Sequence, residues 1–303
     1  MGREELKNLW TIKKILDWTD EYFKKKEVES SRLNAEILLA YLLKKNRLDL
    51  YLEFDRPLSS SELTSFRNLI LKRSHHTPLS YITGEKNFMD FKFKISPDVY
   101  IPRPETEILV EEAIKIIKNL ESENEEGDLE GITVVDLGTG CGNIAVSLAK
   151  ELKKGKVYAV DVSSSALNIA IQNAKLYEVE EKVEFLQGDL FTPLEEISLE
   201  GKVDLIVSNP PYIPAKEIEN LPLEVKKEPR VALEGGEDGL SFYKRIIQES
   251  PRFLKKGGIS ALEIGYNQAK GVRELLDARK TFHSLQIIRN YGGKERIILA
   301  VRG

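Results

Sequence analysis

The sequence contains very few of the residues that form disulfides or bind metals. Cys141 is the only cysteine, so no disulfide can form within the chain. The three histidines are His75, His76 and His283, and this spacing does not match the ligand pattern of a zinc site. These shortages exclude a disulfide framework and predict an intracellular, metal-free protein.

Long apolar runs and an excess of one charge are absent as well. No stretch of about 20 apolar residues, the length that a membrane-spanning helix requires, occurs in the sequence. Residues 1–20 mix charged and apolar side chains, unlike a signal peptide. The formal net charge of -4 provides no general field that attracts nucleic acid or an anionic membrane. We therefore expect a soluble, cytoplasmic protein without a direct nucleic-acid or membrane partner.

Residues 1–85 carry apolar side chains at helical spacing and predict a small all-helical domain. Ser59 and Glu62 stand three residues apart, ahead of an apolar run, which is the pattern of a capping box at a helix start. Two earlier stripes consist of Ile12, Ile15, Leu16 and Phe23, and of Leu33, Ile37 and Tyr41 with Leu38 and Leu42.

The remainder of the chain predicts a connector followed by an α/β domain. Within residues 86–103, two short runs around Met89 and Asp90 indicate a β-hairpin. A helix over 105–119 and an acidic loop over 121–131 precede the first long strand. Because strands then alternate with helices, residues 104–303 predict a mostly parallel sheet covered on both faces. The expected strands are 132–137, 156–160, 183–186, 203–207 and 258–264, with an antiparallel pair at 285–288 and 296–301; expected helices include 144–152, 166–177 and 240–253.

A glycine-rich turn follows the first long strand and opens a helix, where main-chain amides can face a ligand. Its residues are Asp136, Leu137, Gly138, Thr139, Gly140, Cys141 and Gly142. Asn143 stands where a dinucleotide-binding fingerprint has its third glycine, so the spacing is GxGxG. Asp136 would repel a pyrophosphate and favour a ligand with ammonium and sulfonium charges, as S-adenosylmethionine has.

Acidic residues also end the next two strands. Asp161 lies where a carboxylate can accept hydrogen bonds from both hydroxyls of a ribose. Asp189 can accept from an adenine amino group, and Leu190 can pack on the ring. Either aspartate can instead cap a helix or turn. Together with Asn209 they stand at the carboxyl ends of successive strands, where open α/β sheets bind ligands.

The fourth strand runs into Asn209, Pro210, Pro211 and Tyr212. Two prolines make this exit stiff. The Asn209 side-chain oxygen and the Pro210 carbonyl can each accept one hydrogen of an NH2 group, and Tyr212 can stack on its plane. The alternative is a rigid strand exit without a ligand. The pattern favours methyl transfer to a planar amide or amine nitrogen, by direct displacement at the sulfonium methyl.

With these motifs the sequence resembles the bacterial HemK/PrmC family, the peptide chain release factor N5-glutamine methyltransferases, over nearly its whole length. The likeness includes residues 50–52, 55–58, 78–84 and 101–107 in the first part of the chain. It continues through 136–142, 209–213, 228–230, 232–236 and 262–265. The Asn-Pro-Pro-Tyr sequence alone is shared with adenine methyltransferases of nucleic acids.

The resemblance implies a Rossmann-like S-adenosylmethionine-dependent methyltransferase with a helical domain that docks its substrate. That substrate is the glutamine of the Gly-Gly-Gln motif in class I release factors, and the enzyme is expected to be a monomer. The resemblance implies that Tyr100 flanks the glutamine, while residues 209–212 contact it. The cofactor contacts that it implies are Gly138, Thr139, Gly140, Cys141, Gly142, Asp161, Leu190 and Asn209. Arg103 is a further candidate for cofactor binding.

Several alternatives stay open at this point. Arg103, Pro104 and Glu105 also suit a plain helix start. The segment 217–239 is either a lid over the substrate or a surface excursion. An N6-adenine methyltransferase would use the same clamp but would need a basic surface. A cofactor-binding protein without catalysis would not need the clamp.

Overall fold

The computed structural model describes residues 9–123 and 131–303. Its contacts divide the chain into two compact units. The first comprises residues 1–84 with 223–227, and the second comprises residues 85–222 with 228–303. The assignment of residues 1–85, 86–103 and 104–303 to docking, connection and catalysis stays a prediction. Within the described ranges no helix has the length and apolarity to cross a membrane.

The first unit is helical, as expected. Its capping box is confirmed, because Glu62 N donates to Ser59 Oγ at 3.2 Å and Ser59 N donates to Glu62 Oε2 at 2.7 Å. The first apolar stripe is buried, with Ile12, Leu16 and Phe23 fully shielded from solvent. The helices are α2 (Ile12–Lys25), α3 (Ser31–Leu43), α4 (Arg47–Leu52), α5 (Ser60–Ser74) and α6 (Leu79–Thr83).

The second stripe is wrong in part. Leu33 and Tyr41 are exposed, whereas Ala35, Leu38 and Leu39 of α3 are buried. Glu36 shares the buried face because its carboxylate accepts hydrogen bonds from Arg32, Arg47 and Tyr51. A charged residue that is paired inside the protein hides the helical period from a hydrophobicity pattern.

Segment 223–227 belongs to the first unit, although the chain on either side of it belongs to the second. Glu224 accepts a hydrogen bond from the buried Arg73 of α5, whose Nε also donates to Asn34 Oδ1 at 2.6 Å. The surrounding segment contains the 3-10 helices η1 (Ala215–Asn220), η2 (Val225–Lys227) and η3 (Arg230–Ala232). A role of residues 217–239 as a lid stays a prediction.

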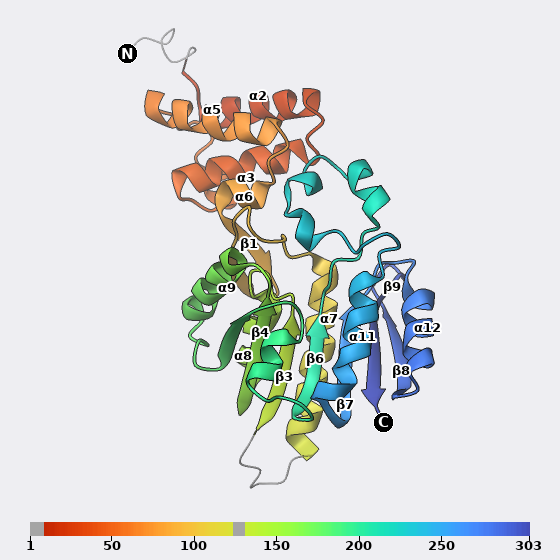
Figure 1. The fold of residues 1–303 in the computed structure, drawn as a ribbon. Helices are drawn as coiled ribbons and strands as arrows, with labels where there is room; N and C mark the ends of the chain where they lie inside the picture. The colour runs from red at the N-terminus through yellow and green to blue at the C-terminus, as the bar shows by residue number, and fades with distance from the viewer. Residues whose placement is uncertain (1–8, 124–130) are drawn as a thin grey trace. The chain divides into compact units, whose positions relative to one another are not determined.

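A hairpin and a seven-stranded sheet form the strands of the second unit (Figure 1). The sheet has the order β5-β4-β3-β6-β7-β9-β8, in which only β9 runs against its neighbours. The expected fold class, a mostly parallel sheet closed by an antiparallel pair, is therefore confirmed. The strands are β1 (Glu85–Phe88), β2 (Phe91–Lys94), β3 (Ile132–Leu137), β4 (Gly155–Asp161), β5 (Val183–Gln187), β6 (Val203–Ser208), β7 (Leu254–Glu263), β8 (Phe282–Arg289) and β9 (Glu295–Arg302).

Helices lie on both sides of this sheet (Figure 1). Side chains of α11 and α12 share one core with Val135 and Leu137 of β3. On the other side, α8 contacts both α7 and α9. Helix α7 continues into the predicted acidic loop, and residues 124–130 of that loop lie outside the described residues. The helices are α7 (Pro104–Glu123), α8 (Asn143–Glu151), α9 (Ser164–Leu176), α10 (Thr192–Glu196), α11 (Ser241–Phe253) and α12 (Ala269–Arg279).

The strand order predicts a ligand-binding crevice at the carboxyl ends of the central strands β3 and β6. From β3 the chain moves outward to β4 and β5, and then returns to β6 on the other side of β3. Open α/β sheets bind ligands at such a reversal, beyond the carboxyl ends of the strands. Leu137 pairs with Ser208, so the glycine turn after β3 and the Asn-Pro-Pro-Tyr exit after β6 begin side by side.

Candidate functional site

The glycine turn offers bare main chain at two of its three glycines. Gly138 (φ 76°) and Gly140 (φ 56°) are left-handed, and a Cβ built on either would meet no heavy atom within 4 Å. A Cβ on Gly142 would instead lie 3.0 Å from the Cβ of Ala170 in α9. The turn is therefore open to a ligand at Gly138 and Gly140, while Gly142 lets two helices pack closely.

The side chains of this turn point inward. Thr139 Oγ1 donates to Asp136 Oδ2 at 2.7 Å, and Ala145 N donates to the same oxygen at 3.2 Å. Asp136 is completely buried, and burial raises its pKa to about 7. Burial likewise raises the pKa of the Cys141 thiol to about 12, which excludes a reactive thiolate at neutral pH. The ligand contacts of Thr139 and Cys141 stay predictions, and the main chain would have to make them because both side chains are buried.

Asp161 braces the turn from the end of the neighbouring strand. Its Oδ2 accepts from Gly140 N at 2.8 Å, and its Oδ1 accepts from Ser163 N at 2.9 Å. The carboxylate is partly buried, and this burial raises its pKa. The structure therefore brings Asp161 against Gly140, and its contact with a ligand stays a prediction.

Asp189 and Leu190 follow β5 but occupy different surroundings. Asp189 is exposed, and its Oδ2 accepts from Arg245 Nη2 at 2.8 Å. A contact with a ligand would have to compete with this ion pair. Leu190 is 92% shielded from solvent within the core that β3 shares with α11. Its φ of 51° is a left-handed conformation that is costly for leucine.

The Asn-Pro-Pro-Tyr exit is held at both ends. Ser208 Oγ donates to Leu137 O at 2.7 Å and ties the exit to the glycine turn. Gln268 Nε2 donates to Tyr212 O at 2.9 Å. A Cβ on Gly235 would lie 2.7 Å from Tyr212 Cα, so the chain can pass there only as glycine.

Asn209 itself is fixed through its nitrogen. Its Nδ2 donates to Thr106 Oγ1 at 3.0 Å, and Thr106 Oγ1 donates to Glu263 Oε2 at 2.7 Å. Among the described residues, nothing donates a hydrogen bond to Asn209 Oδ1 or to the main-chain oxygen of Pro210. Both acceptors of the predicted clamp are consequently available.

Tyr100 and Arg103 lie together beside the clamp. The guanidinium of Arg103 stands 5.0 Å from the centre of the Tyr100 ring. Arg103 also pairs with the buried Glu228, which accepts from Ile101 N at 3.0 Å. Burial raises the pKa of Tyr100 well above 10, and the nearby Tyr212 hydroxyl adds to this rise. Glu228 therefore shapes the loop that presents both predicted residues.

Residues that the sequence did not single out complete the site: Thr106, Glu228, Gly235, Glu263 and Gln268. All but Gln268 stand inside a segment on which the family likeness rests, and that was the available signal. Their partners are far apart in the chain, so the spacing of residues gave no indication of the contacts.

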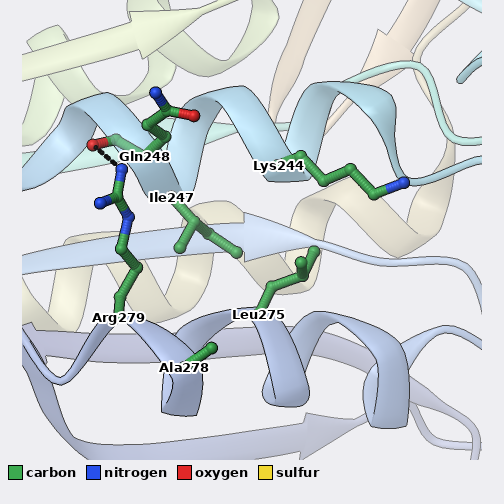
Figure 2. A pocket seen from close by; sticks show the side chains of 6 residues that line it. All are labelled: Lys244, Ile247, Gln248, Leu275, Ala278 and Arg279. Carbon is green, nitrogen blue, oxygen red and sulfur yellow. Dashed lines mark hydrogen bonds between the residues drawn. The ribbon is translucent and has the colours of Figure 1, made fainter.

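A separate surface pocket of about 360 Å³ lies between α11 and α12 (Figure 2). None of its lining side chains is a predicted site residue, and Arg279 Nη2 donates to Gln248 O across it at 3.0 Å. In the described part of the chain, no group of three or more histidine, cysteine, aspartate or glutamate side chains could hold a metal ion.

Two family profiles match the chain. Residues 14–84 match the family described as PrmC N-terminal domain. Residues 128–285 match the family described as methyltransferase domain. The first match falls within the helical region, residues 1–85, and the second falls within the α/β region, residues 104–303.

The chain is also similar to curated relatives and to proteins of solved structure. It is 41% identical to the release factor glutamine methyltransferase of Geobacter sulfurreducens over 88% of this chain and 89% of that protein. It is 38% identical to the release factor glutamine methyltransferase of Moorella thermoacetica over 91% and 93% of the two chains. The solved catalytic domain of hMettl16, in complex with MAT2A 3′UTR hairpin 6, has a TM-score of 0.53 at 16% identity and covers 80% of this chain and 82% of its own. That last likeness concerns the fold alone.

Proposed function

The chain belongs to the family of release factor glutamine methyltransferases, and we propose that it methylates the side-chain nitrogen N5 of a glutamine in class I peptide chain release factors. The glutamine is that of the Gly-Gly-Gln motif, and the methyl donor is S-adenosyl-L-methionine. The similarity to two such enzymes extends over nearly their full length, so both regions of the chain share in it.

One observation carries the proposal. Asn209 Oδ1 and the Pro210 carbonyl are two acceptors free of described partners, and the exit that carries them leaves β6 beside the open glycine turn. A primary carboxamide presents two N–H donors in one plane, which two fixed acceptors can orient. Half-buried Tyr212 follows directly and provides a flat surface for that plane.

The residues near the turn fit S-adenosyl-L-methionine. The open main chain at Gly138 and Gly140 can approach the donor closely, and Asp161 beside it can accept from ribose hydroxyls. Asp189 and Leu190 are proposed to contact the adenine, and Arg103 and Asn209 are proposed as further contacts of the cofactor. When bound, this cofactor supplies a methyl group on a positively charged sulfur, which is open to displacement by a nucleophile.

The chain's own residues then have to make a poor nucleophile react. The lone pair of an amide nitrogen is delocalised into its carbonyl. Acceptance of both N–H hydrogens by Asn209 and Pro210 draws electron density onto nitrogen and fixes its direction. Positioning of this kind, with the reacting atoms about 3–3.5 Å apart, can supply several kcal/mol of the barrier reduction. The proton lost after transfer can pass to water, since no side chain of the clamp has to take it.

The remaining parts of the proposal concern partners and place. Residues 1–85 would dock the release factor, Tyr100 would flank its glutamine, and the enzyme would act as a monomer in the cytoplasm. Residues 86–103 would connect the docking and catalytic parts. The near-neutral overall charge supports a protein substrate over a nucleic acid, because nucleic-acid affinity depends strongly on positive charge.

The test is incubation of the protein with labelled S-adenosyl-L-methionine and a recombinant class I release factor. We expect mass spectrometry to find one added methyl on the glutamine of the Gly-Gly-Gln peptide. The matched control is a release factor in which that glutamine is replaced by glutamate, which has no amide nitrogen. Methyl transfer to another residue type, or to adenine in duplex DNA or RNA offered in parallel, would overturn the proposal.

A further inference from the structure

We propose that Thr106 and Glu263 are positioning residues that hold the Asn209 carboxamide with its oxygen turned toward the acceptor nitrogen. This inference rests on the proposed function, because it concerns how the clamp is oriented. The three residues come from the start of α7, the end of β7 and the exit of β6. All three belong to the second unit.

The clamp has an ambiguity that must be resolved. A carboxamide has an oxygen on one side and an NH2 group on the other, and rotation by half a turn exchanges them. If Asn209 presented its NH2 group to the substrate, two donors would face each other and the clamp would repel its glutamine. Something in the protein must therefore discriminate between the two orientations.

The hydroxyl of Thr106 provides that discrimination. It has a single proton, which it donates to Glu263 Oε2 at 2.7 Å. An ionised carboxylate only accepts hydrogen bonds, so this direction is forced. The hydroxyl oxygen can then only accept from Asn209, and it does so from Nδ2 at 3.0 Å. Asn209 Oδ1 is left on the side away from Thr106.

Glu263 is buried, and the groups around it set its charge. Its pKa is raised to about 7, mainly by burial and in smaller part by the Glu105 carboxylate. The Thr106 hydroxyl, Arg296 of β9 and Arg103 act in the opposite direction. Tyr212 and Tyr243 also lie nearby as neutral hydroxyls. At pH 8 the carboxylate is therefore mainly ionised, which is the state that forces the direction of the Thr106 proton.

The position of the carboxylate is fixed by its main chain. Tyr243 OH of α11 donates to Glu263 O at 2.8 Å, and Glu263 pairs with Ile297 of β9. Thr106 is 2% exposed in the first turn of α7. Neither side chain is placed to reach a ligand directly, so both act through Asn209.

Three substitutions separate orientation from packing. Thr106→Val keeps the shape but removes the hydroxyl, and we expect kcat to fall at least about tenfold with KM for the release factor little changed. Thr106→Ser restores the hydroxyl and should return kcat to within about threefold. Glu263→Gln can donate as well as accept, so Thr106 is free to turn its proton toward Asn209, and kcat should again fall.

The melting temperature, measured beside kcat, distinguishes a positioning role from a purely structural one. Glu263→Gln removes a buried charge, so at pH 8 its melting temperature should equal or exceed that of the parent while kcat falls. Ser260→Ala is the matched control, because this serine is buried in the same strand and its Oγ has no partner among the described residues. Its kcat should not change.

The orientation can also be measured without turnover. In protein labelled with 15N-asparagine, the side-chain NH2 signals of Asn209 are assigned by their loss in Asn209→Ala. We expect Thr106→Val to shift them and Thr106→Ser to restore them. Unshifted signals, or unchanged kcat in both Thr106→Val and Glu263→Gln, would overturn the proposed positioning of Asn209. An enzyme that shows the expected NMR shifts but methylates no release factor glutamine would overturn the proposed function, but not the positioning of Asn209 by Thr106 and Glu263.

Discussion

At the scale of single residues, Asn209 should have the largest effect on the proposed reaction. Asn209→Ala removes one of the two acceptors, and we expect kcat to fall by about a hundredfold or more, as happens when one preorganised polar group is lost from a site. Binding of S-adenosyl-L-methionine should be retained despite the loss of one proposed contact, because the open glycine turn and Asp161 are untouched. Single-turnover methylation and calorimetric titration measure the two quantities. Unchanged turnover would refute the assigned role.

Residue identities in the clamp were predictable, whereas their supports were not. Asn209 and Tyr212 could be named because a strand exit with two prolines is visible in a local stretch of sequence. The contact between Thr106 and Glu263 joins residues 157 positions apart. It exists only because α7 packs against β7, and no local pattern encodes such an approach. The residues were nevertheless inside segments that resemble the family.

At the scale of elements, the glycine turn separates two uses of the same residue type. Gly138→Ala and Gly142→Ala both place a side chain in a left-handed conformation, which costs about 1 kcal/mol. Gly142→Ala also brings a Cβ within 3.0 Å of Ala170 Cβ, so we expect it to lose about 1–3 kcal/mol more stability. Gly138→Ala projects a methyl into the open space of the turn and should mainly weaken cofactor binding.

Gly201→Ala is the matched control for these changes. Gly201 is left-handed with φ 69°, has open space at its Cβ and precedes β6 at the opposite end of that strand from the site. It should show the conformational cost without any change in cofactor affinity. Thermal melts and titration with S-adenosyl-L-methionine give both numbers. Equal effects of Gly138→Ala and Gly201→Ala on affinity would contradict the proposed approach of the cofactor to the turn.

Whether a segment forms a helix or a strand was predictable where its residues are uniformly buried. The residues at which an element begins and ends were less predictable. The strand predicted over 132–137 is confirmed at both ends, because all but one of its residues are buried and most of them are apolar. The strand predicted from residue 258 begins at Leu254. Lys255, Gly257 and their neighbours have the composition of a turn, yet the register with β6 shifts here and the chain continues as strand through the irregularity. Irregular pairing of this kind depends on the partner strand.

At the scale of the whole molecule, the buried carboxylates determine how stability depends on pH. Burial raises the pKa values of Asp136 and Glu263 to about 7, from 3.8 and 4.5, and burial also raises that of Asp161. The folded protein therefore binds more protons than the unfolded chain between these limits. The stability that these groups contribute is complete below about pH 4 and is lost as pH rises through about 7.

Carboxylates of the helical unit change stability with pH in the opposite direction, but they do so in a lower pH range. Partners lower the pKa values of Glu36 and Glu62 below 4.5 against the effect of burial, through Tyr51 and Arg47 for Glu36 and Arg56 for Glu62. Their contribution is present above about pH 4.5 and is lost only as pH falls through their lowered values. Between pH 5.5 and pH 8 the buried carboxyl groups of the second unit therefore determine whether stability rises or falls with pH.

We thus expect the calorimetric unfolding transition of the second unit to lie at a lower temperature at pH 8 than at pH 5.5, by about 3–10 °C for a change of about 1–3 kcal/mol. Asp136→Asn removes one titrating group and should reduce this difference by up to about half. Asp238→Asn is the control, since the hydrogen bond from Lys244 lowers the pKa of Asp238 and places its titration below this range. A transition that rises in temperature from pH 5.5 to pH 8 would mean that Asp136 and Glu263 are ionised in the folded protein already at the lower pH. In that case the Thr106 hydroxyl would be committed to Glu263 throughout, and the orientation of Asn209 would not vary across this pH range.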